Sequence, residues 1–394
     1  MKRKIILLGV AVILIVSLTA SLAATACAPK SPGAEGEDCS AIEAQLSDSE
    51  KQVDDLESEV DDLEAEIKTL KQPAKVYEWE PSIHISAGQM WDALVMMSEE
   101  VEKMSDGRMV WTPMPPGAVC AVEEQLDAVA SGMTECVETS PSYFTGKIPV
   151  LFVESDAMGM TNDIPEMYEL HEVWEDGRLN ELFNEGIAGY GDVVRVAHHY
   201  YPSNPVVITN FPLDSVSDLQ GHKMRAWDWF VDVFTALGAS GTWIPGPELY
   251  TSMSTGVIDG LCYANAPDYV DLSFNEISKY WLKWPAMFGP SCQTMYVNGT
   301  VWNDLPDDLK SIVKNAEIMA QNMNFIEFSL RDAEAWRFAE DYGITMCEWP
   351  KEDLPVLKQA YKSAALDRCI DDASTEAYEV LERWCVSKGY WAAD

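Results

Sequence analysis

The first regular hydrophobic pattern of a folded element is a heptad repeat within residues 41–72. Its apolar positions alternate spacings of four and three, with one interruption at Ser49: Ile42, Leu46, Val53, Leu56, Val60, Leu63, Ile67 and Leu70. Because β-branched residues at one core position and leucine at the other favour two parallel strands, the pattern predicts a coiled-coil stalk that can form a homodimer. A lone amphipathic helix that folds back on the rest of the chain is the alternative.

From residue 75 onward the pattern changes to alternating strands and helices. Strands are predicted near 76–79, 108–113 and 136–140, and helices near 90–105 and 121–131. This order is typical of a parallel α/β sheet, in which ligands bind beyond the carboxyl ends of the strands. We therefore expect the loop 83–88, the segment 138–143 and the residues before Arg225 to border a cleft.

Residues 1–26 have the pattern of an export signal and not of a folded domain. Lys2, Arg3 and Lys4 precede an apolar run and then small residues, which is the order of a secretory signal peptide. The sequence 24–27 (ATAC) resembles a bacterial lipobox, and the resemblance implies that Cys27 becomes a lipidated N-terminus. An uncleaved membrane anchor and plain secretion are the alternatives. All three place the remaining chain outside the cytoplasm, with 27–40 as a flexible tether.

The charge of the chain limits its partners. The sequence has 27 Lys+Arg against 65 Asp+Glu, a net charge of −38, which argues against nucleic acid and against docking on an anionic membrane surface. Its 14 Trp predict an aromatic-rich core or ligand cleft. Seven of the cysteines lie in the predicted body, so at least one of them is free or pairs outside it.

Motifs that carry catalysis are not found in the sequence. It contains no GxSxG, HExxH, glycine-rich phosphate loop or EF-hand loop, so we expect no enzyme activity. His198 and His199 are adjacent, and neighbouring residues on a strand point to opposite faces, so the two are not expected to share one metal ion. His84, His171 and His222 are isolated and are interpreted as structural or exposed.

Several ordered motifs carry a resemblance to a known family. The segment 218–226 reads DLQGHKMRA, 237–240 reads LGAS, 247–260 reads PELYTSMSTGVIDG and 302–309 reads WNDLPDDL. In this order they resemble the solute-binding proteins of tripartite ATP-independent periplasmic (TRAP) transporters. The resemblance covers about 76–394, nearly the whole predicted body.

The resemblance implies a periplasmic-binding-protein-like α/β fold with two lobes, a cleft between them and a long spanning helix, here preceded by the stalk. The expected parts are a first lobe of about 75–200 plus 290–320, a second lobe of about 201–289 plus 321–350, and C-terminal helices in 351–394. Residues 308–337 contain no Pro or Gly and can form the spanning helix.

Arg225 is the principal candidate for ligand binding. It is expected near the end of a strand at the cleft, where a guanidinium can take a carboxylate through two parallel hydrogen bonds. By resemblance it is the carboxylate-binding arginine of the family. The alternative is a structural or surface salt bridge.

The chain most resembles the keto-acid and hydroxy-acid (monocarboxylate) branch, where a Glu after the Asp-Gly pair helps to hold a cation. Cys262 replaces that Glu and removes an oxygen ligand, so we expect no cofactor, and a bound cation beside the ligand is disfavoured but stays an alternative. Further predicted ligand-binding residues are Asn204, Trp227, Tyr263, Glu138 and Tyr143, with Cys262 beside them.

The expected function is capture and not catalysis. A small organic anion, in our interpretation a carboxylate, binds between the lobes and is delivered to a TRAP permease in the membrane. The protein is expected on the outer face of the cytoplasmic membrane, held there by lipid on Cys27. The alternative is a membrane-anchored sensor or scaffold with the same fold and no role in transport.

Overall fold

The computed structural model describes residues 47–48, 51–56, 58–63, 75–155, 160–202, 206–283 and 290–391. The chain divides into two units, Met1–Lys75 and Val76–Asp394. The predicted signal peptide, Cys27 and the tether lie outside the described residues. No helix within the described ranges is both long and apolar enough to cross a membrane.

The described part of the first unit is helical at 47–48, 51–56 and 58–63. The four heptad positions in these ranges are less exposed than their neighbours: Val53, Leu56, Val60 and Leu63. One face of this helix is therefore apolar, and whether it pairs with a second copy stays a prediction.

The second unit contains two α/β lobes. The strands of the first lobe are β1 (Tyr77–Trp79), β2 (Ser82–Ile83), β3 (Met109–Trp111), β4 (Cys136–Thr139), β5 (Val193–Tyr201) and β11 (Ser291–Asn298). Its helices are α3 (Gln89–Met104), α4 (Gln125–Ser131), α5 (Leu151–Ser155), α6 (Ile164–Tyr168), α7 (Arg178–Tyr190) and α11 (Gly299–Asp304). The second lobe contains β6 (Val206–Thr209), β7 (Lys223–Arg225), β8 (Ser240–Thr242), β9 (Gly260–Cys262), β10 (Tyr280–Lys283) and β12 (Thr345–Cys347), with α8 (Phe230–Ala236), α9 (Leu249–Ser254) and α10 (Ala266–Asp271).

Each lobe is built on a mixed sheet. The first has the order β2-β4-β11-β5, in which β2 and β4 are parallel and β11 is antiparallel to both β4 and β5. The second has the order β12-β10-β6-β9-β7-β8. The expectation of a parallel sheet was therefore wrong in part, because β11 returns from the second lobe and enters the first sheet between β4 and β5. Strands β1 and β3 form a separate parallel pair.

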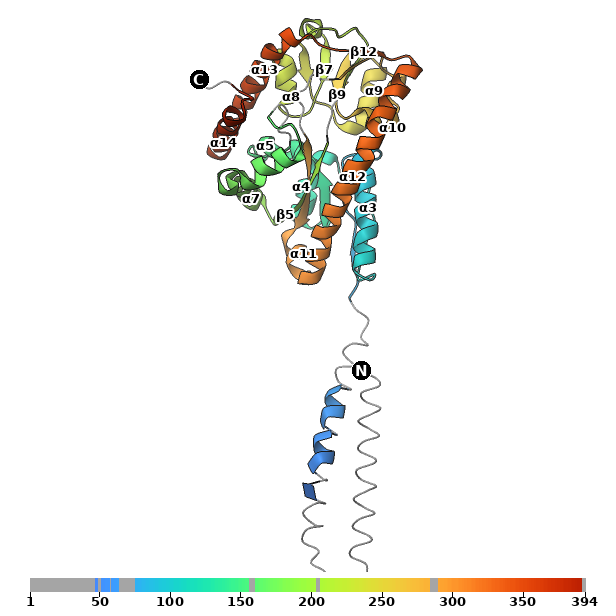
Figure 1. The fold of residues 1–394 in the computed structure, drawn as a ribbon, viewed down its shortest axis with the longest axis vertical. Helices are drawn as coiled ribbons and strands as arrows, with labels where there is room; N and C mark the ends of the chain where they lie inside the picture. The colour runs from blue at the N-terminus through green and yellow to red at the C-terminus, as the bar shows by residue number, and fades with distance from the viewer. Residues whose placement is uncertain are drawn as a thin grey trace, which may run out of the picture. The chain divides into compact units, whose positions relative to one another are not determined.

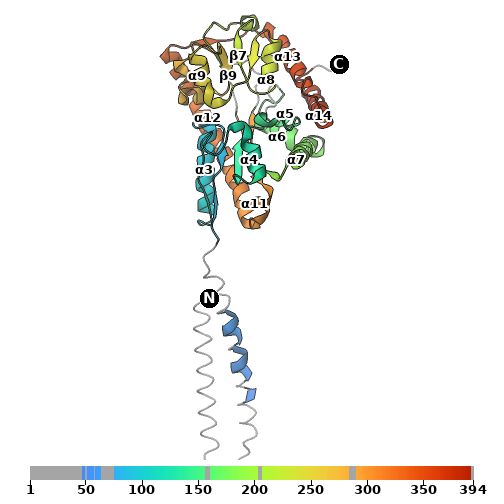
Figure 2. The same ribbon diagram turned by 180° about the vertical axis from the view of Figure 1, so that it is seen from behind.

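Among the described elements, helix α12 (Asp307–Tyr342, 36 residues) spans both lobes, and the chain also crosses between the lobes more than once. The chain passes from β5 to β6 and returns from β10 to β11. Helix α12 packs on α3 and β5 in the first lobe and on α10 in the second (Figures 1 and 2). The predicted two-lobed fold with a long spanning helix is thus confirmed.

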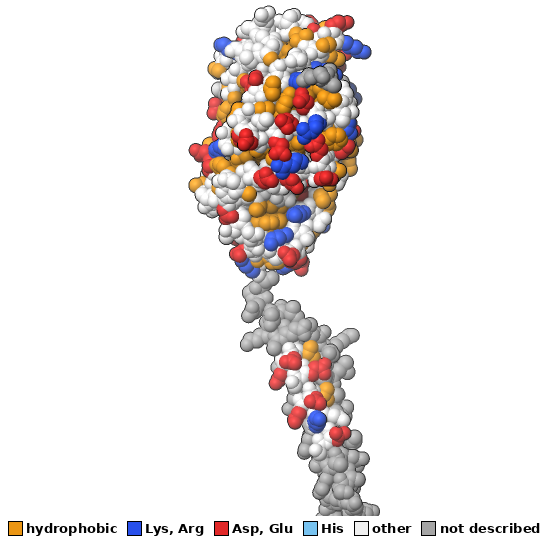
Figure 3. All heavy atoms as spheres, turned by 90° about the vertical axis from the view of Figure 1, so that its left-hand side faces the viewer, with side chains coloured by type: hydrophobic (Ala, Val, Ile, Leu, Met, Phe, Trp, Pro, Cys, Tyr) orange, Lys and Arg blue, Asp and Glu red, His pale blue; other side chains and the backbone are white. Residues whose placement is uncertain are grey.

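Two C-terminal helices complete the body. Helix α13 (Leu354–Leu366) packs on α8, and α14 (Asp372–Lys388) packs on α5 and α7. Three ion pairs hold the α14 side chains to the segment around α7: Arg178–Glu376, Arg383–Glu175 and Lys388–Glu169. On this side of the body acidic side chains are interspersed with basic ones (Figure 3).

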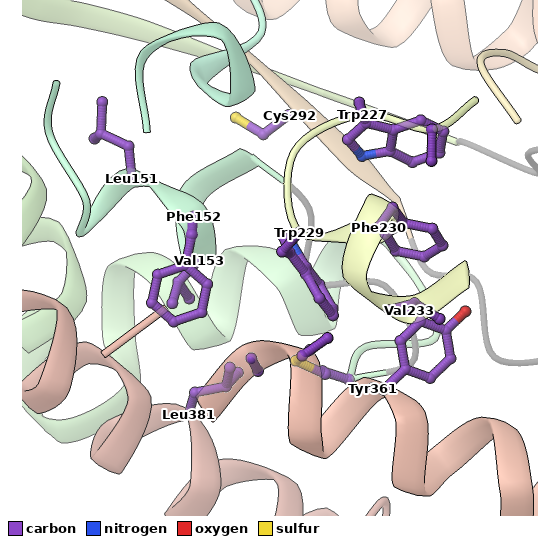
Figure 4. Packing of buried hydrophobic residues seen from close by; sticks show 14 of the residues in the cluster. Leu151, Phe152, Val153, Trp227, Trp229, Phe230, Val233, Cys292, Tyr361 and Leu381 are labelled. Carbon is purple, nitrogen blue, oxygen red and sulfur yellow. The ribbon is translucent and has the colours of Figure 1, made fainter. Parts of the chain in front are cut away.

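Aromatic side chains form a core where α8 packs on α13 (Figure 4). Trp229 is 1% exposed and packs against Tyr361, with ring centroids 5.9 Å apart. Trp227 stacks on Phe230 with ring centroids 4.9 Å apart. Since buried aromatic rings of this size dominate core energetics, the segment that follows β7 is held firmly in place.

The described body also contains free thiols, at Cys120, Cys136, Cys292, Cys347, Cys369 and Cys385. This finding confirms that at least one cysteine of the body is free.

Candidate ligand-binding site

A polar hollow lies where the two sheets approach each other, and it encloses about 390 Å³, its open mouth included. Residues of both lobes line it: His84, Ser140, Ser142, Tyr143, Tyr201, Ser291 and Gln293 from the first, and Arg225, Trp227 and Tyr263 from the second. Most of them belong to strand ends or to the turns that follow strands. A ligand held here would touch both lobes at once.

Arg225 is the only arginine or lysine among the described residues that line this hollow. It ends β7, which pairs in parallel with β8 and β9, and its side chain is buried. Its Nε donates to the carbonyl oxygen of Ile244 at 2.9 Å, and Nη1 donates to that of Cys262 at 3.1 Å. These two bonds fix the plane of the guanidinium, and its carbon lies 4.8 Å from the ring centroid of Tyr263.

The guanidinium of Arg225 has no counter-ion among the residues that the structure describes. Among the residues that the structure describes, no carboxylate forms an ion pair with it. Burial lowers the pKa of Arg225, as expected for a cation removed from water. A buried charge of this kind favours the binding of an anion, which would supply the missing partner.

Aromatic groups that stay uncharged surround this arginine. Burial raises the pKa of Tyr143 and holds the pKa of Tyr263 well above its usual range, so both phenols keep their protons. Burial, and then the charge of Arg225, lower the pKa of His84 to about 3, so its imidazole is neutral at physiological pH. The His84 ring lies 5.4 Å from that of Tyr143.

Three buried polar atoms at the hollow have no hydrogen-bond partner in the structure: His84 Nδ1, Trp227 Nε1 and Gln293 Oε1. The other end of the Gln293 amide donates to the hydroxyl of Tyr201 at 3.2 Å. Since buried polar groups are normally hydrogen-bonded, these atoms mark positions where polar groups of a ligand would bind.

Four of the predicted site residues line the hollow together, namely Arg225, Tyr143, Trp227 and Tyr263. Cys262 is buried on β9 and meets Arg225 through its backbone carbonyl, and its side chain is not among the lining groups. Glu138 is buried on β4 and does not line the hollow either. Asn204 lies outside the described residues. The ligand-binding roles of all these residues stay predictions.

Sequence reasoning missed six lining residues: His84, Ser140, Ser142, Tyr201, Ser291 and Gln293. His84, Ser140 and Ser142 lie in the loop and segment that the strand pattern predicted as cleft borders, so that signal was available. Ser291 and Gln293 lie on β11, a strand for which the sequence offered no position relative to the cleft.

Two α/β lobes around a polar hollow with a buried arginine define a two-lobed solute-binding protein. The family model described as bacterial extracellular solute-binding protein, family 7 (DctP), matches residues 86–368. The chain belongs to this family, whose members bind solutes and are not enzymes. The resemblance to solute-binding proteins of TRAP transporters is thereby confirmed.

Two curated relatives match most of the chain. A protein of Nostoc sp. named monocarboxylate 2-oxoacid-binding periplasmic protein is 26% identical, over 73% of this chain and 77% of the relative. A solute-binding protein of Roseobacter denitrificans is 25% identical, over 74% of this chain and 85% of the relative.

Solved structures of TRAP solute-binding proteins share the fold. One from Bordetella bronchiseptica, described with copurified calcium and picolinate bound in its active site, has a TM-score of 0.72 and 18% identity and covers 80% of this chain and 94% of its own. One from Roseobacter denitrificans with bound L-galactonate has a TM-score of 0.68 and 22% identity and covers 79% of this chain and 99% of its own.

Proposed function

We propose that the protein captures a small organic acid in the hollow between its lobes and delivers it to a TRAP-type permease. The observation that carries this proposal is the buried guanidinium of Arg225, which has no carboxylate partner among the described residues and lines the hollow. A ligand carboxylate would accept hydrogen bonds from this group and neutralise it. Charge-assisted bonds of this type are roughly twice as strong as those between neutral groups.

The remaining lining groups suit the body of such a ligand. Tyr143, Trp227 and Tyr263 offer aromatic surface, while His84 and Gln293 offer neutral polar atoms for a hydroxyl or oxo substituent. The printed ligands of relatives support this ligand class. The Nostoc protein is named for monocarboxylate 2-oxoacids, and the Roseobacter structure holds L-galactonate, another carboxylate.

Delivery requires that a partner distinguishes the loaded protein from the empty one. A ligand that contacts both lobes stabilises their closed arrangement by its differential affinity for that state. By its family, the partner that reads this closure is a TRAP permease driven by an ion gradient.

The N-terminal segment would hold the body at the membrane. We propose that Cys27 is lipidated, that 27–40 is a tether and that 41–72 is a stalk that dimerises. The lipobox-like sequence and the heptad support this assignment, as does the lower exposure of Val53, Leu56, Val60 and Leu63. The unaltered protein should incorporate a labelled fatty acid in cells and Cys27→Ser should not, and equal labelling of the two would contradict lipidation at Cys27.

A thermal-shift screen of the purified protein tests the proposal for the ligand. A ligand at a hundred times its Kd stabilises the folded state by about 2.7 kcal/mol. We expect at least one 2-oxo or 2-hydroxy acid to raise the Tm, and its amide analogue to leave the Tm unchanged. If no carboxylate raises the Tm, the hollow does not serve organic-acid capture. If a carboxylate raises the Tm but a strain that lacks the gene for this protein still takes up that carboxylate normally, a sensor or scaffold role replaces transport.

A further inference from the structure

A second group of functional side chains is buried outside the hollow. Glu138 on β4, His199 on β5 and Glu317 on α12 each offer one ligand atom, and these atoms all lie within 4.8 Å of one another. His199 Nδ1 lies 2.6 Å from Glu317 Oε1 and 3.9 Å from Glu138 Oε1. All three residues are at least nine-tenths buried, and none of them lines the ligand hollow.

The sheet register brings these residues together. Glu138 on β4 is the cross-strand partner of Met295, and His199 on β5 is the cross-strand partner of Gln293. Met295 and Gln293 are two residues apart on β11, the strand between β4 and β5. Since residues two apart on a strand share a face, Glu138 and His199 lie on the same face of the sheet. Helix α12 packs against this sheet and supplies Glu317.

Several buried carboxylate oxygens of this cluster have no hydrogen-bond partner. Neither carboxylate oxygen of Glu138 has a hydrogen-bond partner, and Oε2 of Glu317 has none. In the part of the chain that the structure describes, no lysine or arginine pairs with either group. The two buried carboxylates therefore have one imidazole beside them and no described cation that would neutralise both. A buried charge that is not neutralised costs on the order of several kcal/mol per ion, because the ion loses its hydration.

We propose that Glu138, His199 and Glu317 form a buried binding site for a divalent transition-metal cation, with Zn²⁺ as the best fit. One imidazole nitrogen and two carboxylate oxygens are ligands that Zn²⁺ binds at about 2.0–2.2 Å, in tetrahedral geometry. Ca²⁺ fits less well, because it takes about 6–8 oxygen ligands. The double positive charge balances both carboxylates, and the second oxygen of a carboxylate or one water would complete the tetrahedron.

The surroundings of His199 suit a ligand role. The side-chain amide of Asn324, two turns further along α12 than Glu317, lies with its Nδ2 2.8 Å from His199 Nε2. The two ends of an Asn amide are exchangeable by rotation, so Oδ1 can occupy that position and accept a hydrogen bond from Nε2–H. A histidine that binds metal through one nitrogen commonly donates its other N–H in this way. Nδ1 is then left with its lone pair toward the two carboxylates.

The location gives the site a structural consequence. A cation there would tie α12, which packs on both lobes, to the sheet of the first lobe. His199 is the cross-strand partner of Gln293, and Gln293 lines the ligand hollow. The bound metal would therefore restrict the movement of α12 relative to β5 and β11, the strands that border the hollow on this side. This proposal stands on its own observations, so it can fail while the ligand-binding proposal holds.

Protons are the competing occupants of the site. Burial, and then the charge of Glu317, hold the pKa of Glu138 well above its usual range, so protonation of Glu138 is the alternative way to reduce the negative charge of the cluster. Such a cluster would retain no metal.

The test uses the full protein without a histidine tag. After treatment with a chelator and dialysis against ZnCl₂ and then metal-free buffer, bound zinc is measured by plasma mass spectrometry. We expect about one Zn²⁺ per chain, a Tm that rises with Zn²⁺ and less with Ca²⁺, and visible absorption typical of four-coordinate metal after Co²⁺ replacement. His199→Gln and Glu138→Gln should each weaken retention at least tenfold.

His198→Gln is the matched control, because His198 is the neighbouring residue on the opposite face, beside Glu154. It should retain zinc like the unaltered protein. Glu317→Gln replaces any variant whose circular dichroism shows that it does not fold. Substoichiometric zinc in the unaltered protein would overturn the proposal. Equal retention by the His199 and His198 variants would overturn it as well.

Discussion

Asp268 in the second lobe accepts a hydrogen bond from the backbone N–H of Gln89 in the first lobe, at 2.8 Å. Asn265 Nδ2 donates to Gln89 Oε1, also at 2.8 Å. The preceding Gly88 has φ +84°, and a Cβ there would lie 2.5 Å from Asp268 Oδ1, so the close approach of the lobes requires glycine. The N-terminus of α3 and the first turn of α10 therefore form a direct contact between the lobes.

This contact predicts a pH dependence. Burial raises the pKa of Asp268 to about 7, from an ordinary value of 3.8. Between these two values the folded state binds more protons than the unfolded state, so the contribution of Asp268 to stability falls as pH rises through that window. Asp268→Asn removes the penalty. Its advantage over the unaltered protein should be near zero at pH 4 and on the order of 2–4 kcal/mol at pH 8.

Urea unfolding at several pH values measures this difference. Asp304→Asn is the control, since Asp304 is exposed at the end of α11 and is not the acceptor for Gln89. An advantage of Asp268→Asn that does not change with pH would contradict the assignment.

Gly246 leaves room for the side chain of Tyr263, which is a predicted ligand contact. A Cβ on Gly246 would overlap the hydroxyl end of Tyr263, whereas a Cβ on Gly146 would meet nothing within 4 Å. Gly246→Ala should displace the Tyr263 ring at the hollow and weaken ligand binding roughly tenfold or more, about 1.4 kcal/mol. Gly146→Ala should leave affinity unchanged. Calorimetric titration of both variants decides, and equal affinities would show that Tyr263 does not contact the ligand.

A buried ion pair supports the opposite face of the first sheet. Arg195 Nη2 lies 2.6 Å from Glu154 Oε1, with side chains 1% and 0% exposed, and Thr294 donates to the same oxygen at 2.9 Å. Removal of one partner leaves a buried charge, so Glu154→Ala or Arg195→Ala should each cost about 3–5 kcal/mol. The double variant should cost much less than their sum. Chemical denaturation of the two single variants and the double variant measures their losses in the free energy of unfolding. Losses that simply add would indicate that Arg195 and Glu154 do not stabilise each other.

The sequence predicted the features that local patterns encode. The motif around Arg225 placed this residue at the end of a strand, and the same stretch identified Trp227 and, further on, Tyr263. The Pro/Gly-free segment predicted α12, although its ends at Asp307 and Tyr342 lie beyond the expected ones. These properties depend on neighbours within a few residues, which is why a single sequence reveals them.

The features that the sequence did not predict depend on contacts between distant segments. His84 was interpreted as structural or exposed, yet the fold places it beside Arg225, and nothing in the residues around His84 indicates that contact. Likewise, opposite faces were correctly predicted for His198 and His199. The carboxylates beside His199 come from β4 and α12, 61 and 118 positions away. A strand pattern gives the face of a side chain, but not what packs against that face.

The central claim is that Arg225 binds the carboxylate of the ligand, and calorimetric titration of Arg225→Met tests it most directly. Methionine keeps most of the apolar stem and removes the charge. For an organic acid found by the screen, the account predicts an affinity loss of roughly 10²–10³-fold, because a buried partner of a charge is lost. Arg331→Met, which alters a partly exposed arginine paired with Asp271, should bind the acid as the unaltered protein does. Equal affinity of Arg225→Met and the unaltered protein would contradict the account.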